Sequence, residues 1–542
     1  MTLPFVEDAG HLHPLKSKFF NSPMHRRSAT KVCNDRNVPI HCPPVDPFAW
    51  ASVLSAATPS VTAELLRLRA TLLSPGTTTF PTSRLLKADA DDLLVSEHVE
   101  IVTADNQWQT TGTCTPFFVL EEREAGPRRR FILWPKAQNL AAYAGGFKPD
   151  VPLDHVSRYL AAVRHECAGL RDLKVAFWQM ELSPQERANF RFKDELGRIL
   201  QPTRLPMGFC ASVDILHRIT EVVAGSPGFA RDETPGVDID CWVDGIRAAG
   251  DFDTVRAAMR TIDRRAEELG VTFKEHAAPH ADYDFVGVHF DHLQHRTRCK
   301  DAILAKLDAE VITARDFLAL FGRAVFAAGA NRTPLAKFYW AIKRMRRLSS
   351  QLQKHPQQMW LPLDPPPSPT FLAQLAQMRA LATQWSPIVA QPKELSAILF
   401  SDASFEGWGA VLCVDNGEVF AAGDRWCPRY EGADISVLEC EAVRCGLFAF
   451  YERLATVGRL ELRVDNTSTE AALARGVARA DGLNAALLPV LRHLAEHFPS
   501  CRTSVGYVPT AQNPADGPSR GRAPGPVPRH CAAPPRPLRI SV

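Results

Sequence analysis

The sequence predicts an α+β multidomain protein, and three observations lead to that prediction. Its 542 residues amount to about three to four average domains. Hydrophobic residues make up 45% of the chain and charged residues 23%, a balance that allows several buried cores. Extended β-branched stretches and helical apolar periods both occur, and the Pro-rich segment 363–369 divides the chain into two blocks.

Composition excludes several classes of protein. The 13 cysteines contain no Cys-x-x-Cys pair and follow no secretory leader, which indicates a reducing compartment rather than a disulfide framework. No apolar run approaches the roughly 18 to 20 residues that span a bilayer. We therefore expect a nuclear or cytoplasmic protein without a membrane partner.

Net charge says little about the partner. A value of +3 is weak for a nucleic-acid-binding protein, because phosphate neutralisation needs a locally basic surface. Arginines and lysines do gather in the stretches 123–136 and 343–347. Either stretch taken alone is more typical of a solvated helix or hairpin face. Identification of the partner therefore depends on the motifs.

Local patterns assign elements to the first block. Residues 1–48 mix Pro, Asn, Arg and His without an apolar period, which predicts a loose arm. Beyond the arm, helical apolar spacing predicts helices, and β-branched or aromatic runs predict strands. In chain order these are a helix over 50–73, a hairpin of 114–120 with 130–134, a helix over 154–170 and a strand over 173–182.

Helical spacing predicts further helices over 303–347, at the end of the first block, and over 371–385, at the start of the second block after the Pro-rich segment. A different pattern follows, in which extended runs come before and after one helix. It consists of strands over 397–402, 407–414 and 418–423, a helix over 436–453 and a strand over 460–464. The Pro-rich residues 522–542 are expected to lack fixed structure.

Two aspartates of the first block are candidates for one cation site. Asp172 lies at the start of the predicted strand 173–182, and Asp244 belongs to an Asp-Gly pair between two extended runs, which is a hairpin signal. A hairpin tip beside a strand end can bring both carboxylates to a pair of divalent ions. An Asp-Gly hairpin taken alone is more often only a turn.

The motifs around these aspartates, from about Cys114 to Lys306, resemble those of reverse transcriptases. Asp172-Leu-Lys-Val-Ala-Phe-Trp-Gln is similar to the first metal motif of that family, and Gln201-Pro-Thr-Arg-Leu-Pro-Met-Gly-Phe209 is similar to its template and nucleotide floor. Thr115-Pro-Phe-Phe-Val-Leu and Pro135-Lys-Ala-Gln-Asn139 resemble fingers motifs, and Phe285-Val-Gly-Val-His-Phe290 resembles the approach to the thumb. The resemblance implies a right-hand polymerase with fingers, palm and thumb.

The resemblance also implies roles for single residues. It gives catalytic roles to Asp172, Asp244 and Lys274, the lysine matching the residue proposed to protonate the pyrophosphate leaving group. It places Phe177 at the gate where a bulky ring excludes a ribose 2′-hydroxyl. The nucleotide-binding residues that it implies are Arg123, Arg130, Phe177, Met207 and Gly208. Two Mg²⁺ ions per active site, or Mn²⁺ in their place, are the implied cofactors.

One position departs from the family. The second metal motif usually carries two adjacent aspartates, whereas this chain has Asp244-Gly245. Three readings stay open: Asp172 and Asp244 suffice with backbone and water ligands, Asp240 assists, or the polymerase is impaired. Tyrosine-recombinase retroelements of the DIRS and VIPER kinds are similar in replacing that second aspartate. The variant and the absence of an integrase motif suggest such a retrotransposon, with other element-encoded proteins as further partners.

Four spaced carboxylates of the second block form another candidate site. Asp402 ends one predicted strand, Asp465 follows another, Glu439 lies on the helix between them, and Asp516 lies in Asn513–Arg520. A two-metal nuclease uses about four carboxylates to hold two Mg²⁺ ions roughly 4 Å apart. Each residue alone is an ordinary strand-end or capping carboxylate.

In this order the four resemble the RNase H domains of retroelements across about 395–520, which implies an α/β domain with a mixed five-stranded sheet. Glu441 competes with Glu439 for the helix position. Two residues on a helix are about 200° apart, so only one can face the metals. Alignment with the motif favours Glu439.

Together the two resemblances imply an RNA-directed DNA polymerase with RNase H activity, acting on an RNA template, a DNA primer, dNTPs and the RNA–DNA hybrid. An RNase H nuclease with an impaired, nucleic-acid-binding polymerase domain is the alternative. A non-catalytic interaction protein leaves the four nuclease carboxylates unexplained. The expected domains are a disordered arm 1–48, an N-terminal extension 49–104, fingers and palm 105–300, thumb and connection 301–360, a linker 361–394, an RNase H-like domain 395–521 and a disordered tail 522–542.

Overall fold

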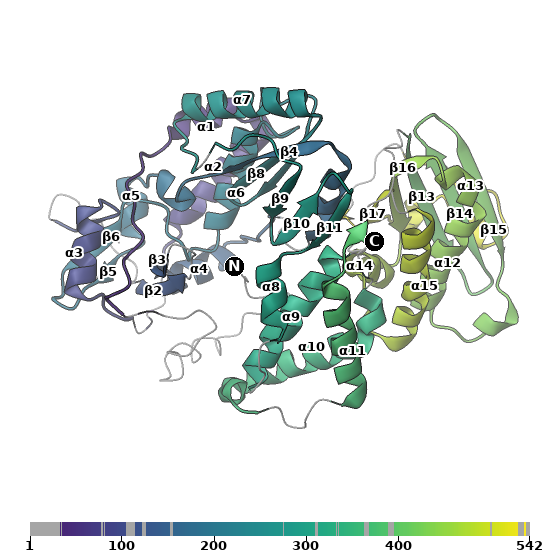
Figure 1. Cartoon of the computed structure of the whole chain (residues 1–542). Coiled ribbons are helices and arrows are strands. Elements are labelled where there is room, and N and C mark those ends of the chain that lie inside the picture. The colour runs from purple at the N-terminus through teal and green to yellow at the C-terminus, as the bar shows by residue number, and fades with distance from the viewer. Residues whose placement is uncertain are drawn as a thin grey trace. The chain divides into compact units, whose positions relative to one another are not determined.

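The computed structural model describes residues 33–528 except 34, 77–79, 81, 104–113, 122–125, 152–155, 275, 309–312, 332, 334, 363–367, 388–394 and 499–500, together with 536–537. The chain forms two compact units (Figure 1). The first unit comprises Met1–Leu153 and Cys167–His280, and the second comprises Asp154–Glu166 and Ala281–Val542. Of the predicted site residues, Arg123 lies outside the described part, as does most of the Pro-rich segment.

The centre of the first unit is a three-stranded antiparallel sheet in the order β4-β8-β7. Helix α7 packs on β4 and β8, and α6 packs on β7 and β8 (Figure 1). The Asp251 side chain caps α7 by accepting the Thr254 N–H. The elements are β4 (Cys167–Asp172), α6 (Ser212–Ala224), β7 (Asp238–Trp242), β8 (Gly245–Gly250) and α7 (Phe252–Leu269).

The predicted hairpin of the first block is confirmed. Strands β2 (Thr115–Glu121) and β3 (Arg128–Trp134) pair antiparallel, with Phe118 opposite Phe131. The predicted helix over 50–73 is divided because Pro59 begins a new helix. The remaining elements are α1 (Trp50–Ala56), α2 (Pro59–Ala70), η3 (Thr71–Leu73), α3 (Lys87–Val95), β1 (Val99–Ile101), α4 (Lys136–Ala144), α5 (Pro184–Ala188), β5 (Phe192–Lys193) and β6 (Ile199–Pro202).

The prediction for 154–182 is wrong in its boundaries. After η5 (Val156–Arg164), strand β4 begins at Cys167, and Asp172 is its last residue rather than the residue before a strand. Val175 then adopts a φ of 43°, and the chain continues as η6 (Ala176–Gln179). The buried Gln179 amide donates to the carbonyls of Lys174 and Thr272 at 2.7 and 2.8 Å. These contacts satisfy a turn that the apolar run does not reveal.

Part of the expected loose arm is ordered. The Cys33 N–H donates to the Phe118 carbonyl at 2.9 Å, and Ile40 bridges to Arg129. The Phe48 side chain is buried, and its N–H donates to the Gln179 carbonyl at 2.9 Å. Backbone pairing with hairpin edges requires no apolar period, which explains why the sequence pattern did not indicate it. Residues 1–32 lie outside the described part.

The second unit begins with a small sheet in the order β12-β11-β10-β9. Helices occur where the periods over 303–347 and 371–385 predicted them, and α11 packs on α9 through Phe371 and Phe317. The elements are β9 (Asp282–Phe285), β10 (Val288–Asp291), β11 (Arg296–Cys299), β12 (Ser386–Pro387), α8 (Asp301–Leu304), η7 (Ala305–Asp308), α9 (Ala314–Ala330), η8 (Leu335–Phe338), α10 (Tyr339–Lys354), η9 (Pro356–Trp360) and α11 (Pro369–Ala382).

A second sheet of this unit has the order β15-β14-β13-β16-β17-β18. The first three strands pair antiparallel, whereas β13-β16 and β16-β17 pair parallel. The predicted mixed five-stranded sheet is therefore confirmed, with the two-residue β18 added at its edge. The strands are β13 (Leu395–Ala403), β14 (Gly407–Val414), β15 (Val419–Arg425), β16 (Val457–Val464), β17 (Arg502–Tyr507) and β18 (Arg536–Pro537).

Helix α12 packs on β13 and β14, and α15 packs on α12 (Figure 1). Part of the expected disordered tail is ordered, because the Gly525 N–H donates to the Pro514 carbonyl at 3.0 Å and β18 pairs with β17. No helix in the described part is long and apolar enough to cross a membrane. The helices are η10 (Pro428–Tyr430), α12 (Ile435–Ala449), α13 (Tyr451–Leu454), α14 (Thr467–Arg475), α15 (Asp481–His497), η11 (Thr510–Gln512) and α16 (Asp516–Ser519).

We predict that Gly409→Ala destabilises the second unit. A Cβ at Gly409 would lie 2.4 Å from the Ser519 nitrogen and 2.5 Å from the Ala515 carbonyl oxygen, so backbone would have to move. Overpacking of this kind costs about 1–3 kcal/mol, which corresponds to a melting temperature lower by roughly 5 °C. Gly482→Ala is the control, because its Cβ would meet only Val437 at 3.5 Å. Equal melting temperatures of the two variants in calorimetry would contradict the prediction.

Candidate active sites

Strand register determines where the first two of the four spaced carboxylates lie. Strands β13 and β16 are parallel neighbours, and Ser401 lies opposite Val464. Asp402 follows Ser401 and Asp465 follows Val464, so both aspartates lie at the carboxyl edge of the sheet. Carboxyl ends of parallel strands are where α/β sheets present functional groups. The sheet therefore brings two acidic residues together that are 63 positions apart in sequence (465 − 402).

The third carboxylate comes from the helix that covers the sheet. Glu439 lies on α12, and ligand oxygens of Asp402, Glu439 and Asp465 all lie within 4.8 Å of one another. Glu441 takes no part in this group, since its carboxylate accepts a hydrogen bond from Arg444 Nε at 2.6 Å. The structure thus places Glu439, the residue that the motif favoured, beside Asp402 and Asp465, and it pairs Glu441 with Arg444 instead.

Asp516 reaches the same edge through a close backbone approach. The Ala515–Ser519 segment lies against Gly409, which is opposite Asp402 in the β13-β14 register. Ser519 Oγ donates to Asp402 Oδ2, and Arg520 Nη2 pairs with Asp516 Oδ1 at 3.0 Å. Sequence reasoning did not assign roles to Ser519 or Arg520. The glycines of Gly407-Trp-Gly409 were the available signal, because residues without a side chain allow backbone to pack closely.

The pKa values of the clustered carboxyl groups are raised. Burial and, to a smaller extent, the charges of Asp465 and Asp516 raise the pKa of Asp402 to about 6, against the Ser519 hydrogen bond, which lowers it. Burial, followed by Asp465 and Asp402, raises the pKa of Glu439 to about 9. Charged carboxylates held this close are unfavourable without a cation. The site is therefore arranged to bind positive charge.

These residues fit a divalent metal ion. Carboxylate oxygens are the ligands that Mg²⁺ and Mn²⁺ prefer. Glu439 Oε2 is buried and accepts no hydrogen bond from the described residues, so it is an acceptor directed into the cluster. A cation there would satisfy this oxygen and neutralise the repulsion. Asp402, Glu439 and Asp465 are the residues that could hold the ion, with Asp516 beside Asp402.

The palm-type residues of the first unit are joined through their backbones. The Leu173 N–H donates to the Asp244 carbonyl at 2.9 Å, and the Lys274 N–H donates to the Asp172 carbonyl at 2.8 Å. Asp172, Asp244 and Lys274 therefore lie side by side, although they come from three distant motifs. Asp172 and Lys274 are exposed, and Asp244 is half-buried.

The position of Gly245 is defined by strand register. Gly245 begins β8 and lies directly opposite Asp172 on β4. Paired residues in an antiparallel sheet point to the same face, with Cβ atoms about 4.5–5.5 Å apart. Asp240 does not replace the missing carboxylate, because it is held by the fully buried Arg247 at 2.5 Å. That contact argues against the reading in which Asp240 assists.

Asp244 is electrostatically coupled to its neighbours. Burial and, to a smaller extent, the Asp172 charge raise the pKa of Asp244 to about 6, and the Arg130 charge opposes both. Arg130 thus lies within electrostatic range of the palm carboxylates. Its guanidinium also pairs with Glu121 at 3.1 Å across the hairpin. A nucleotide phosphate would have to compete with that carboxylate for Arg130.

The predicted nucleotide floor is built around Gly208. This residue has a φ of 137°, and a Cβ there would lie 2.4 Å from the Leu133 carbonyl oxygen, so only glycine fits. Asn139 on α4 donates to the Gly208 carbonyl at 2.9 Å and accepts the Cys210 N–H at 2.8 Å. Met207 and Phe177 are half-buried and pack against the same core. The gate role of Phe177 stays a prediction.

Comparisons with known proteins find similarity only among solved structures. No protein-family profile matches the sequence, and no curated protein matches it. Structures of a foamy viral protease-reverse transcriptase resemble the chain. Its dRH form in complex with double-stranded DNA is 14% identical with a TM-score of 0.48, and the match covers 86% of this chain and 83% of that one.

The foamy viral protein in complex with double-stranded DNA is 15% identical with a TM-score of 0.46, covering 85% and 96% of the two chains. In complex with an RNA/DNA hybrid it is 14% identical with a TM-score of 0.47, covering 91% and 66%.

We predict that the metal-free protein is less stable at high pH and that Asp465→Asn corrects this. Asp402 and Glu439 have folded pKa values of about 6 and about 9, above their ordinary values of 3.8 and 4.5. Their stabilising contribution is therefore complete below about pH 4 and is lost as the pH rises through 6 and 9. Removing the Asp465 charge reduces the repulsion on both residues and should raise the free energy of unfolding at high pH by on the order of 1 kcal/mol.

Melting temperatures in EDTA check this prediction. Asp465→Asn should melt above the wild type at pH 8 and equally at pH 5, and Mg²⁺ should raise the wild-type value at pH 8. Asp424→Asn, an exposed aspartate of the same sheet, is the control and should show no such difference. A variant that melts below the wild type at pH 8 would exclude repulsion as the dominant effect.

Proposed function

We propose that this protein is an RNA-directed DNA polymerase with RNase H activity, which copies retroelement RNA into DNA and degrades the RNA strand of the hybrid. The observation that carries the proposal is the convergence of Asp402, Glu439 and Asp465 within 4.8 Å at the carboxyl edge of a mixed sheet. The same chain joins Asp172, Asp244 and Lys274 through backbone hydrogen bonds. The Asp244-Gly245 variant supports a source in a tyrosine-recombinase retroelement.

In the nuclease reaction, two bound Mg²⁺ ions would activate the attacking water and stabilise the leaving 3′-oxygen. Asp402 and Asp465 at the strand ends and Glu439 on α12 would hold this charge, and Asp516 would add a carboxylate from α16. Ser519 orients Asp402 by donating to its Oδ2. Arg520 neutralises Asp516 at the rim of the site, where the RNA phosphate would also bind.

In the polymerase reaction, Asp172 and Asp244 are the carboxylates that would hold the metal-bound triphosphate in line with the primer 3′-hydroxyl. Lys274 lies beside Asp172 and is the candidate proton donor to pyrophosphate. Gly208 lets the backbone approach closely, and Phe177 would exclude the ribose 2′-hydroxyl. The template, primer, hybrid and dNTPs are the implied partners.

A second candidate function is a nuclease carried on a nucleic-acid-binding domain that does not polymerise. Gly245 motivates it, because the residue opposite Asp172 offers no side-chain ligand. Asp240 is already paired with Arg247 and does not compensate. The two candidates differ only in primer extension.

We predict that the two activities can be abolished separately. Asp172→Asn should lower extension of a DNA primer on an RNA template by about 100-fold or more, since each 1.36 kcal/mol of lost stabilisation is tenfold. Cleavage of a labelled RNA–DNA hybrid in the same tube should not change. Asp465→Asn should do the reverse. Wild-type cleavage without extension would establish the second candidate, and absence of both activities would reject the proposal.

We predict that Gly245→Asp increases primer extension several-fold at limiting Mg²⁺. The added carboxylate would point to the same face as Asp172, at the distance of a cross-strand pair. Gly245→Asn is the matched control, since it has the same shape without the charge. The measurement is the Mg²⁺ concentration for half-maximal extension, which the aspartate should lower more than the asparagine. Equal values for the two variants would mean that the ligand charge is not limiting.

A further inference from the structure

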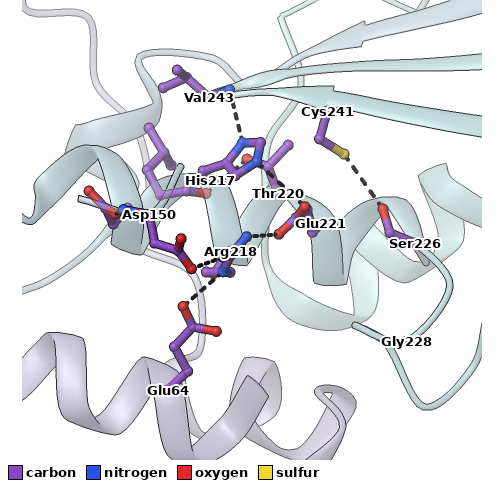
Figure 2. A network of polar contacts seen from close by, with 12 residues as sticks. Glu64, Asp150, His217, Arg218, Thr220, Glu221, Ser226, Gly228, Cys241 and Val243 are labelled. Atoms are coloured by element: carbon purple, nitrogen blue, oxygen red, sulfur yellow. Dashed lines mark hydrogen bonds and ion pairs between the residues drawn. The ribbon is translucent and has the colours of Figure 1, made fainter. Parts of the chain in front are cut away.

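A buried histidine lies beneath the turn that carries Asp244. His217 is on α6, and 1% of its surface is exposed. Its Nδ1 accepts the backbone N–H of Val243, the residue before Asp244, at 3.2 Å (Figure 2). Accepting at Nδ1 places the ring hydrogen of the neutral imidazole on Nε2. One side of the ring is therefore committed to the β7-β8 turn.

The turn that His217 contacts has an unfavourable backbone. Val243 has a φ of 56°, the left-handed region that a β-branched residue rarely adopts. Strained positions of this kind persist only where the surroundings hold them, and they cluster at active sites. Here the strained residue directs Asp244 so that its carbonyl accepts the Leu173 N–H at 2.9 Å. The placement of Asp244 against Asp172 thus depends on how Val243 is held.

A network of charged side chains lies beside the histidine, whose Nε2 makes no hydrogen bond with any described residue (Figure 2). His217 Nε2 lies 3.4 Å from Glu221 Oε1, one helical turn along α6. Arg218 Nη1 donates to Glu221 Oε2 at 2.7 Å, and Arg218 Nε donates to Glu64 Oε1 on α2 at 3.0 Å. Arg218 also pairs with Asp150 at 3.4 Å. The network connects α2, α6 and the turn within the first unit.

We propose that His217 is a positioning residue that holds Asp244 in place by accepting the Val243 N–H. The proposal rests on the proposed polymerase function for its kinetic consequence. Its structural consequence, a turn kept in one conformation, does not depend on that function. A leucine would fill similar volume but would offer no acceptor, and the constraint on Val243 would be lost.

The test compares substitutions that keep or remove the acceptor. His217→Asn retains an acceptor on the δ atom, whereas His217→Gln moves it one bond further and His217→Leu removes it. Thr220→Val is the control, because it removes a buried hydroxyl from the same helix without touching the turn. We expect His217→Leu and His217→Gln to lower kcat for primer extension about tenfold, with the dNTP KM within about twofold. His217→Asn and Thr220→Val should stay near the wild type.

Hydrogen exchange of peptides covering 238–247 provides a readout independent of activity. Exchange should become faster in His217→Leu and His217→Gln but not in His217→Asn. If the leucine variant does not fold, the comparison of asparagine with glutamine decides the question. Unchanged exchange and unchanged kcat in the glutamine variant would overturn the positioning role, as would a changed KM with an unchanged kcat. No extension by the wild type would reject the proposed polymerase activity, and hydrogen exchange would still test the positioning role of His217.

Discussion

Repulsion between carboxylates that share one small space is the constraint on which the candidate nuclease site depends. Asp402, Glu439 and Asp465 lie within 4.8 Å of one another in a largely buried position, where like charges are costly. Burial first, and this repulsion second, raise the pKa of Asp402 to about 6 and that of Glu439 to about 9. A fold that keeps such a cluster must hold each carboxylate with the surrounding structure, and a bound cation would remove the repulsion.

The surrounding structure meets this requirement in two ways. Parallel pairing of β13 and β16 fixes Asp402 and Asp465 at the same edge, so the backbone ladder resists their separation. The loop from Asn513 to Ser519 then closes over Asp402, because Gly409 leaves room for its backbone. Asn513 donates to the Ser401 carbonyl at 2.9 Å, and Ser519 donates to Asp402 itself. The glycine and the two polar side chains are thus as necessary to the geometry as the acids.

Repulsion between carboxylates is smaller at the site of Asp172 and Asp244, which holds fewer charges. Asp172 and Asp244 are joined by backbone hydrogen bonds to neighbouring segments, and Gly245 leaves the position opposite Asp172 without a carboxylate. Asp240, which is nearby in sequence, is neutralised by Arg247. Lower negative charge reduces repulsion and also weakens the attraction for metal ions. The strained turn at Val243 then becomes the element that sets where Asp244 lies.

The sequence by itself determined the elements with a clear period and the identity of the acidic residues. The hairpin of β2 and β3, the strands β13, β14, β15 and β16, and α12 all follow from local alternation or helical spacing, which require no distant partner. Tertiary structure alone decided which groups meet. Strand register places Gly245 opposite Asp172, and hydrogen bonds of the buried Gln179 stabilise the turn after Asp172. Ion pairs with Arg247 and Arg444 hold Asp240 and Glu441 outside the two sites. These outcomes depend on contacts between segments far apart in the chain, and local sequence patterns do not encode such contacts.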